Sequence, residues 1–152
     1  MIIYVENNKK GIFSINPEEG VALVNPVNLK GVMGGGLAKV FKEKFPNNFK
    51  KYQWACKEAD WFKNGSGNSL YVKENGYIIV NFPTKIDWKE PSSYTLIHNS
   101  LRKLRDSYSK WGIKTIAMPK VGCGLGGLDW NKVKSLIEKV FDQEEVKLFI
   151  FE

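Results

Sequence analysis

The chain has 152 residues, of which 43% are hydrophobic and 26% are charged, a composition that suits one soluble globular domain over residues 1–152. The apolar start, "MIIYV", is too short for a signal peptide or a membrane span, so we expect a cytoplasmic protein without membrane contact. The net charge of +7 is spread along the chain and favours anionic partners, although a solvated lysine-rich surface would give the same charge.

Short apolar segments alternate along the chain with segments of helical periodicity, which is typical of an α/β fold. The expected strands are rich in β-branched and aromatic residues and are bounded by polar or glycine positions. They cover residues 2–5, 20–25, 68–74, 77–82, 114–119 and 146–151.

Four apolar stripes at helical spacing predict helices that pack on this sheet. The first two helices meet near Pro46, the third follows Pro91, and the last begins at Trp130 behind Asp129 as its N-cap. Residues 63–69, "KNGSGNS", predict a turn-rich connection rather than a domain boundary. The stripes are Leu37, Val40, Phe41 and Phe45; Phe49, Tyr52, Cys56 and Ala59; Ile97, Leu101, Leu104 and Tyr108; and Trp130, Val133, Ile137 and Val140.

Cysteine and histidine are too sparse for a metal site. Cys56 and Cys123 lie far apart, form no CxxC pair and have only His98 as a histidine neighbour in the sequence. We therefore expect no disulfide, no metal and no cofactor. His98 is predicted to be a surface or packing residue, and Cys123 lacks a partner base for a role as a nucleophile.

Two glycine-rich loops each stand between an expected strand and an expected helix. One contains Gly34 to Gly36 and precedes Leu37, while the other, "PKVGCGLGGLDW", spans residues 119–130 and precedes the helix at Trp130. In a parallel sheet such loops gather at the carboxyl ends of the strands, where helix N-termini present unpaired N–H groups. Because glycine lets an anion approach the backbone, the pair predicts a diphosphate-type ligand; two tight packing turns are the alternative.

Two familiar phosphate-binding motifs are missing. Neither loop has the Gly-Lys-Ser/Thr sequence of a Walker loop, and Lys39 stands where the Rossmann fingerprint has its third glycine. A nucleotide triphosphatase and a hydride-transfer enzyme are both disfavoured.

Three motifs together make the chain resemble a macrodomain, a three-layer α/β/α fold with a central mixed sheet of about six strands that binds ADP-ribose. Within that fold they resemble the DNA ADP-ribosyl glycohydrolase antitoxins of the DarG type and relatives that remove terminal ADP-ribose from proteins. Yeast-type ADP-ribose 1''-phosphate phosphatases are also similar. The motifs are "VNPVNLKGVMGGGLAKVFKEKFP", "VNFPTKIDWKEPSS" and "MPKVGCGLGGLDW".

The resemblance implies roles for the residues that match its motifs. Lys85 falls at the position of a catalytic lysine, and Asn28 would contact the distal ribose beside the bond to be broken. Gly126 stands where protein-directed relatives carry an aspartate, so an aspartate-dependent mechanism is in doubt, whereas the DarG-type loop agrees with this sequence. The residues expected to bind ADP-ribose are Asn25, Gly31, Val32, Met33, Gly34, Gly35, Gly36, Leu37, Thr84, Pro119, Gly122, Cys123, Gly124, Leu125, Gly126 and Gly127.

Lys85 has two chemical uses in such a reaction. As an ammonium it donates a proton to the leaving group or stabilises departing charge. To attack a ring-opened sugar it must first lose its proton, and nearby phosphates oppose that loss because they favour the charged form. The ammonium role is therefore the preferred hypothesis; without the resemblance, Lys85 reads as a surface lysine at a strand end.

Three functions remain open from the sequence. The first is a metal-independent enzyme that hydrolyses ADP-ribose from a modified macromolecule, preferably DNA, with single-stranded DNA contacts through the basic surface. The second is an ADP-ribose 1''-phosphate phosphatase, and the third is a module that binds ADP-ribose without turnover. Trp61, Trp88 and Lys89 are candidates for a nucleic acid contact, although an aromatic residue is more often part of a core. A monomer is the default expectation for a small domain.

Overall fold

A six-stranded mixed sheet runs through the middle of the molecule in the computed structural model, which describes residues 1–152. The strand order is β1-β6-β5-β2-β4-β3; the first five strands in that order are parallel, and β3 pairs antiparallel with β4 at one edge. All six expected strands are confirmed, with ends that differ by at most two residues. They are β1 Ile2–Val5, β2 Val21–Val27, β3 Leu70–Glu74, β4 Tyr77–Pro83, β5 Thr115–Pro119 and β6 Lys147–Phe151.

Strand β2 continues past its expected end at residue 25, through a proline. Val27 O accepts a hydrogen bond from Thr84 N on the β4 side (2.9 Å), so the alternation of the backbone turns the Pro26 nitrogen to the other side of the strand. On that side β5 pairs with β2 only as far as Leu23. The missing N–H of Pro26 therefore breaks no ladder hydrogen bond.

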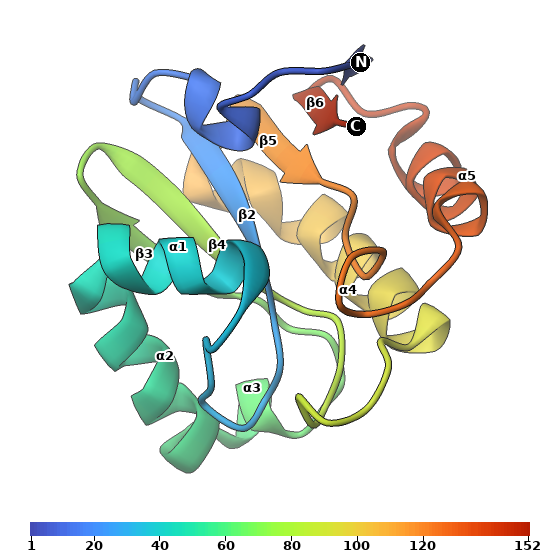
Figure 1. Ribbon diagram of the computed structural model, residues 1–152. Helices are drawn as coiled ribbons and strands as arrows, with labels where there is room; N and C mark the ends of the chain where they lie inside the picture. The colour runs from blue at the N-terminus through green and yellow to red at the C-terminus, as the bar shows by residue number, and fades with distance from the viewer.

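Helices cover both faces of the sheet, as Figure 1 shows, with α1, α2 and α3 on one face and α4 and α5 on the other. The alternation of β2 serves both layers, since Ala22 and Val24 pack under α4 and α5 while Leu23 packs under α1 and α2. None of these helices is both long and apolar enough to cross a membrane. Their bounds are α1 Gly36–Lys44, α2 Pro46–Glu58, α3 Asp60–Lys63, α4 Tyr94–Ser107 and α5 Trp130–Phe141.

The four expected helices are confirmed, and the break between the first two lies at Pro46 as predicted. Pro46 stands in the first turn of α2, where its missing N–H is not needed. Glu74 of β3 accepts a hydrogen bond from Asn48 N (2.7 Å) and so caps that turn. Tyr108 falls in a short 3₁₀ helix, η2 Tyr108–Trp111, rather than in α4.

Other short elements were not expected from the sequence: α3 and a 3₁₀ helix, η1 Gly11–Ser14. Each has four residues, which is too short to show a helical repeat of apolar positions.

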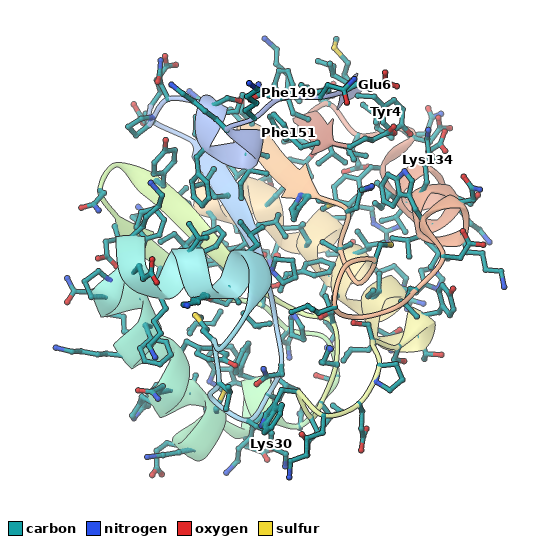
Figure 2. The ribbon with its side chains drawn as sticks, viewed as in Figure 1. Tyr4, Glu6, Lys30, Lys134, Phe149 and Phe151 are labelled. Atoms are coloured by element: carbon teal, nitrogen blue, oxygen red, sulfur yellow. The ribbon has the colours of Figure 1, made fainter.

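Side-chain contacts tie the last helix to the far edge of the sheet. Lys134 of α5 lies over the Tyr4 ring of β1, with its Nζ 4.3 Å from the ring centroid, and pairs with the Glu152 carboxylate at 3.2 Å. Figure 2 shows Tyr4 and Lys134 together at this edge, above α5.

The adjacent parallel strands β5 and β2 send their chains to opposite faces of the sheet. The chain leaving β2 enters α1 on one face, and the chain leaving β5 reaches α5 on the other. In open α/β sheets, ligands bind at the carboxyl ends of two strands that part in this way. Both glycine loops lie at this point.

Candidate functional site

The first glycine loop is built around Asn28, which is buried directly after β2. Its Oδ1 accepts hydrogen bonds from Lys30 N (3.0 Å) and Val32 N (3.4 Å), and its Nδ2 donates to Val32 O at 2.7 Å. The Tyr52 hydroxyl, from α2, lies 2.8 Å from Oδ1 as a further donor. The Asn28 Oδ1 and one Nδ2 hydrogen therefore hold the loop in place. The second Nδ2 hydrogen remains free to donate to a ligand.

Helix α1 begins on the glycine triplet without a side-chain cap. Gly35 is the N-cap in an extended conformation, no side chain accepts a hydrogen bond there, and Gly36 has a φ of +58°. The first N–H groups of a helix have no partner within the helix. An anion at this end would accept those hydrogen bonds and would lie at the positive end of the helix dipole.

The second glycine loop closes on itself and on the start of α4. Leu128 N donates to Gly122 O, and Ser92 N donates to Gly126 O, each at 2.9 Å. A Cβ at position 126 would collide with Ser92 Oγ and would lie 2.5 Å from Gly122 O. A side chain at position 126 therefore has no room unless the Gly122 backbone shifts.

Leu125 brings the two loops together. Its Cδ1 lies 3.2 Å from the position of a Cβ at Gly35 and 3.4 Å from that at Gly36. The side chain is nevertheless 80% exposed. The second loop therefore reaches over the start of α1, as expected of two loops that face one ligand.

Lys85 lies beside the Asn28 loop, just past the end of β4. Thr84 N donates to Val27 O and Leu29 N donates to Ile86 O, each at 2.9 Å, so the two chain segments stay paired on both sides of Lys85. The Lys85 side chain is partly exposed and has no ion pair within the protein. No carboxylate of the protein neutralises its ammonium group.

The chemistry of the second loop does not favour a thiol nucleophile. Burial raises the pKa of Cys123; nearby Lys120 lowers it and Asp129 raises it. The Cys123 Sγ donates to Val121 O at 3.4 Å. Asp129 is the N-cap of α5, as predicted, and its Oδ1 accepts from Asn131 N at 3.0 Å. Cys123 therefore stays a neutral thiol near pH 7.

Two of the expected ligand residues lie beneath the first loop. Asn25 is fully buried and donates from Nδ2 to Asn81 Oδ1 at 3.2 Å, while its own Oδ1 has no hydrogen-bond partner. Met33 is 2% exposed, and its Sδ lies 3.9 Å from the Asn25 amide. The side chains of both residues support the first loop from below.

The remaining expected residues differ in their exposure to solvent. Val32, Gly34, Gly36, Gly124, Leu125 and Gly127 are exposed, Gly31, Gly35, Leu37, Pro119, Gly122 and Cys123 are partly buried, and Thr84 and Gly126 are buried.

Three supporting residues escaped the sequence analysis as parts of this site. Ser92 lies under the second loop with a buried hydroxyl that has no partner. The Tyr94 hydroxyl accepts a hydrogen bond from Asp129 N at 2.9 Å, and Tyr52 holds Asn28 from α2. Ser92 belongs to the "PSS" of the second motif, but sequence spacing does not reveal which serine contacts a loop 34 residues further along the chain. Tyr52 is part of an apolar helical stripe, and the sequence therefore predicts a core residue there.

A family model described as "Macro domain" matches residues 24–137. A DNA ADP-ribosyl glycohydrolase of Thermus aquaticus is 36% identical over 137 residues, which cover 86% of this chain and 37% of that protein's length. The solved macrodomain of Thermus aquaticus DarG superimposes with a TM-score of 0.85 at 33% identity, covering 100% of this chain and 98% of that one. A structure of Thermosipho africanus DarTG in complex with ADP-ribose matches with a TM-score of 0.77 at 33% identity, over 86% of this chain and 37% of that one.

Proposed function

Because the chain belongs to the macrodomain family, we propose that it binds ADP-ribose between its two glycine loops. We propose further that the protein hydrolyses ADP-ribose from a modified macromolecule, with DNA as the preferred substrate. The observation that carries this proposal is the pair of glycine loops at the point where β2 and β5 part, with Lys85 beside them. A cytoplasmic monomer is part of the same proposal.

The diphosphate is proposed to lie between the two loops. On one side, the first-turn N–H groups of α1 carry no side-chain cap. On the other side, residues 122–127 present a backbone with few side chains. Hydrogen bonds from N–H groups to a charged phosphate are stronger than those between neutral groups.

The distal ribose is proposed to lie against Asn28 and Lys85. The free Nδ2 hydrogen of Asn28 would donate to a ribose hydroxyl. The Lys85 ammonium would give a proton to the departing atom as its bond to C1'' breaks. Water adds to C1'', and the proton that it releases returns to Lys85, so the enzyme ends unchanged. Attack by a neutral Lys85 on a ring-opened sugar is the alternative mechanism, and only that path gives an imine that borohydride can trap.

Two observations make DNA the preferred substrate: the net charge of the chain is positive, and a similar protein is named a DNA ADP-ribosyl glycohydrolase. The chain has 23 lysines and arginines, and only two ion pairs form in the structure, Arg105 with Asp106 and Lys134 with Glu152. Behind the first loop, a cavity of about 220 Å³ is lined by Lys30, Lys57 and Lys63 with no carboxylate among its residues. Figure 2 shows Lys30 at the tip of the molecule below α3. Unpaired lysines of this kind favour a polyanion.

One panel of substrates tests the proposal. Purified protein is given a single-stranded oligonucleotide ADP-ribosylated on thymidine, an ADP-ribosylated protein, and ADP-ribose 1''-phosphate. Release of ADP-ribose from the oligonucleotide at the highest kcat/KM is expected. Release of phosphate alone would instead identify a phosphatase, and calorimetric binding of ADP-ribose with no turnover of any substrate would identify a binding module.

A further inference from the structure

A second groove lies at the β3 edge of the sheet, away from the glycine loops. It has a volume of about 530 Å³ and is bounded by the segment before β3, the end of α4 and the helix η2. Strand β3 pairs only with β4, so its other side is free. Nothing in the candidate site uses this groove.

Two exposed tryptophans line the groove. Trp111 stacks on Tyr71 of β3, with ring centroids 4.7 Å apart and planes at 18°. Tyr71 is fixed in turn by a hydrogen bond between its hydroxyl and Ser107. Because only one face of the Trp111 ring rests on Tyr71, the residue is still 41% exposed, and Trp61 in the same groove is 47% exposed. A flat, fixed and partly exposed ring is a surface on which a nucleobase stacks.

The charge of the groove is positive. Lys103 and Lys110 line it, and neither forms an ion pair. The single acid in the lining is Asp106, whose Oδ1 lies 3.0 Å from Arg105 Nε. Arg105 offsets that acid, so the two lysines are left for a phosphate backbone.

Two contacts connect the chain that borders the groove with the segment that carries Lys85. The turn before β3 touches this segment, since a Cβ at Gly65 would lie 2.9 Å from Ile86 Cδ1. At the start of β3, Leu70 pairs with Asn81 of β4. Asn81 precedes Lys85 by four residues, or roughly 13 Å of extended chain. One strand of nucleic acid can therefore reach both places.

The Tyr71–Trp111 stack has an alternative explanation, in which Trp111 only covers the edge strand β3 and protects it from pairing with another chain. Such a cover explains the stack, but it explains neither the exposure of Trp61 nor the unpaired Lys103 and Lys110 beside it.

We propose that this groove binds the single-stranded DNA that flanks the modified nucleotide, with a base on the outer face of Trp111 and phosphates at Lys103 and Lys110. This inference rests on the proposed function for the identity of the strand. It adds to that function a site that selects long substrates over a single modified nucleotide.

Binding of an unmodified thymidine oligonucleotide tests the groove without any hydrolysis. Anisotropy of the labelled oligonucleotide is measured with the wild type, Trp111→Ala, Trp111→Phe and the double variant Lys103→Glu, Lys110→Glu. The Ala and Glu variants are expected to bind at least about ten-fold more weakly, and Trp111→Phe should lie between them and the wild type, since phenylalanine keeps a stacking face. Loss of two phosphate contacts should also reduce the slope of log K against log salt by about 1.4.

Matched controls come from outside the groove. Trp54→Ala removes a tryptophan of α2 that is 55% exposed, and Lys139→Glu reverses an exposed lysine of α5. Both should bind within about two-fold of the wild type. Equal losses in these controls and in the groove variants, or unchanged binding in the groove variants, would overturn the proposal. Tighter binding of an RNA oligonucleotide of the same base sequence would overturn the assignment to DNA.

Hydrolysis then separates this inference from the proposed function. With an ADP-ribosylated oligonucleotide, the groove variants should raise KM about ten-fold with kcat unchanged, and with ADP-ribosylated thymidine nucleotide they should match the wild type. If no substrate is hydrolysed but the groove variants still lose oligonucleotide binding, the function fails and the groove stands. If hydrolysis proceeds and KM is the same in all variants, the function stands and the groove fails.

Discussion

The Ser92 hydroxyl occupies the space that a Cβ at Gly126 would need, so these two residues are in direct contact. Ser92 N also donates to Gly126 O at 2.9 Å, so the start of α4 holds the second glycine loop from below. The packing of this chain therefore leaves no room for an aspartate side chain at position 126. Any catalytic group must come from elsewhere in the candidate site.

Substitution of Gly126 by aspartate is expected to damage the protein rather than to add a catalytic group. The new Cβ meets Ser92 Oγ and Gly122 O, and overpacking of this kind costs roughly 1–3 kcal/mol. Urea denaturation should show that loss, and calorimetry should show weaker ADP-ribose binding. Gly124→Ala is the control for the stability measurement alone, because a Cβ there meets nothing within 4 Å. A Gly126→Asp variant with wild-type stability and higher activity would contradict the steric explanation.

Removal of the Lys85 amine is expected to abolish turnover without abolishing binding. General acid catalysis contributes about 10²- to 10⁴-fold to rate, so Lys85→Ala should lower kcat by at least about 100-fold while the Kd for ADP-ribose changes little. Single-turnover kinetics and calorimetry measure the two effects. Lys89→Ala, on the same segment, is the control and should keep wild-type kcat. Full activity of Lys85→Ala would remove Lys85 from the mechanism.

The contact between Leu125 and Gly35 is expected to show as coupling in a double-mutant cycle. A methyl group at position 35 would lie 3.2 Å from Leu125 Cδ1 and must push that side chain away. Gly35 has a φ of −156°, so alanine brings no backbone strain there. Gly35→Ala should weaken ADP-ribose binding several-fold in the wild type and less in a Leu125→Ala background. Additive effects in calorimetry would show that the two loops do not act together.

Stability is expected to fall at high pH because of Cys56. Burial raises the pKa of this thiol from 9.0 to about 11. Below pH 9 the thiol is protonated in the folded and unfolded chains alike; between pH 9 and pH 11 only the unfolded chain loses the proton, so the free energy of unfolding decreases as pH rises.

Urea denaturation at pH 8 and pH 10.5 measures this effect, which should be roughly 1–2 kcal/mol after allowance for partial exposure. Cys56→Ala should lose less stability over the same interval. Tyr52, whose pKa burial also raises, accounts for part of what remains. An identical loss in Cys56→Ala and the wild type would exclude Cys56 as the cause.

The order of strands and helices could be predicted from the sequence because it depends on local patterns. Apolar runs in β2 and β4 and the stripes of α1, α2, α4 and α5 carry their own periodicity, and Pro46 marks a break that proline imposes in any fold. The two glycine loops could be paired as well, since each stands between a strand and a helix and parallel strands end at one edge of a sheet. Their facing positions in the structure agree with that prediction; the role of each residue toward a ligand stays a prediction.

The sequence by itself determined the α/β class, the six strands and the pair of glycine loops, because the periodicity and conformational freedom of residues are properties of short segments. Only the tertiary structure decided what depends on contacts between distant segments. It placed Ser92 under Gly126, Tyr52 against Asn28, and Trp111 on Tyr71, pairs that lie between 24 and 40 residues apart in the chain. Steric exclusion at Gly126 and the positive groove at β3 arise from such pairs, and no local pattern encodes them.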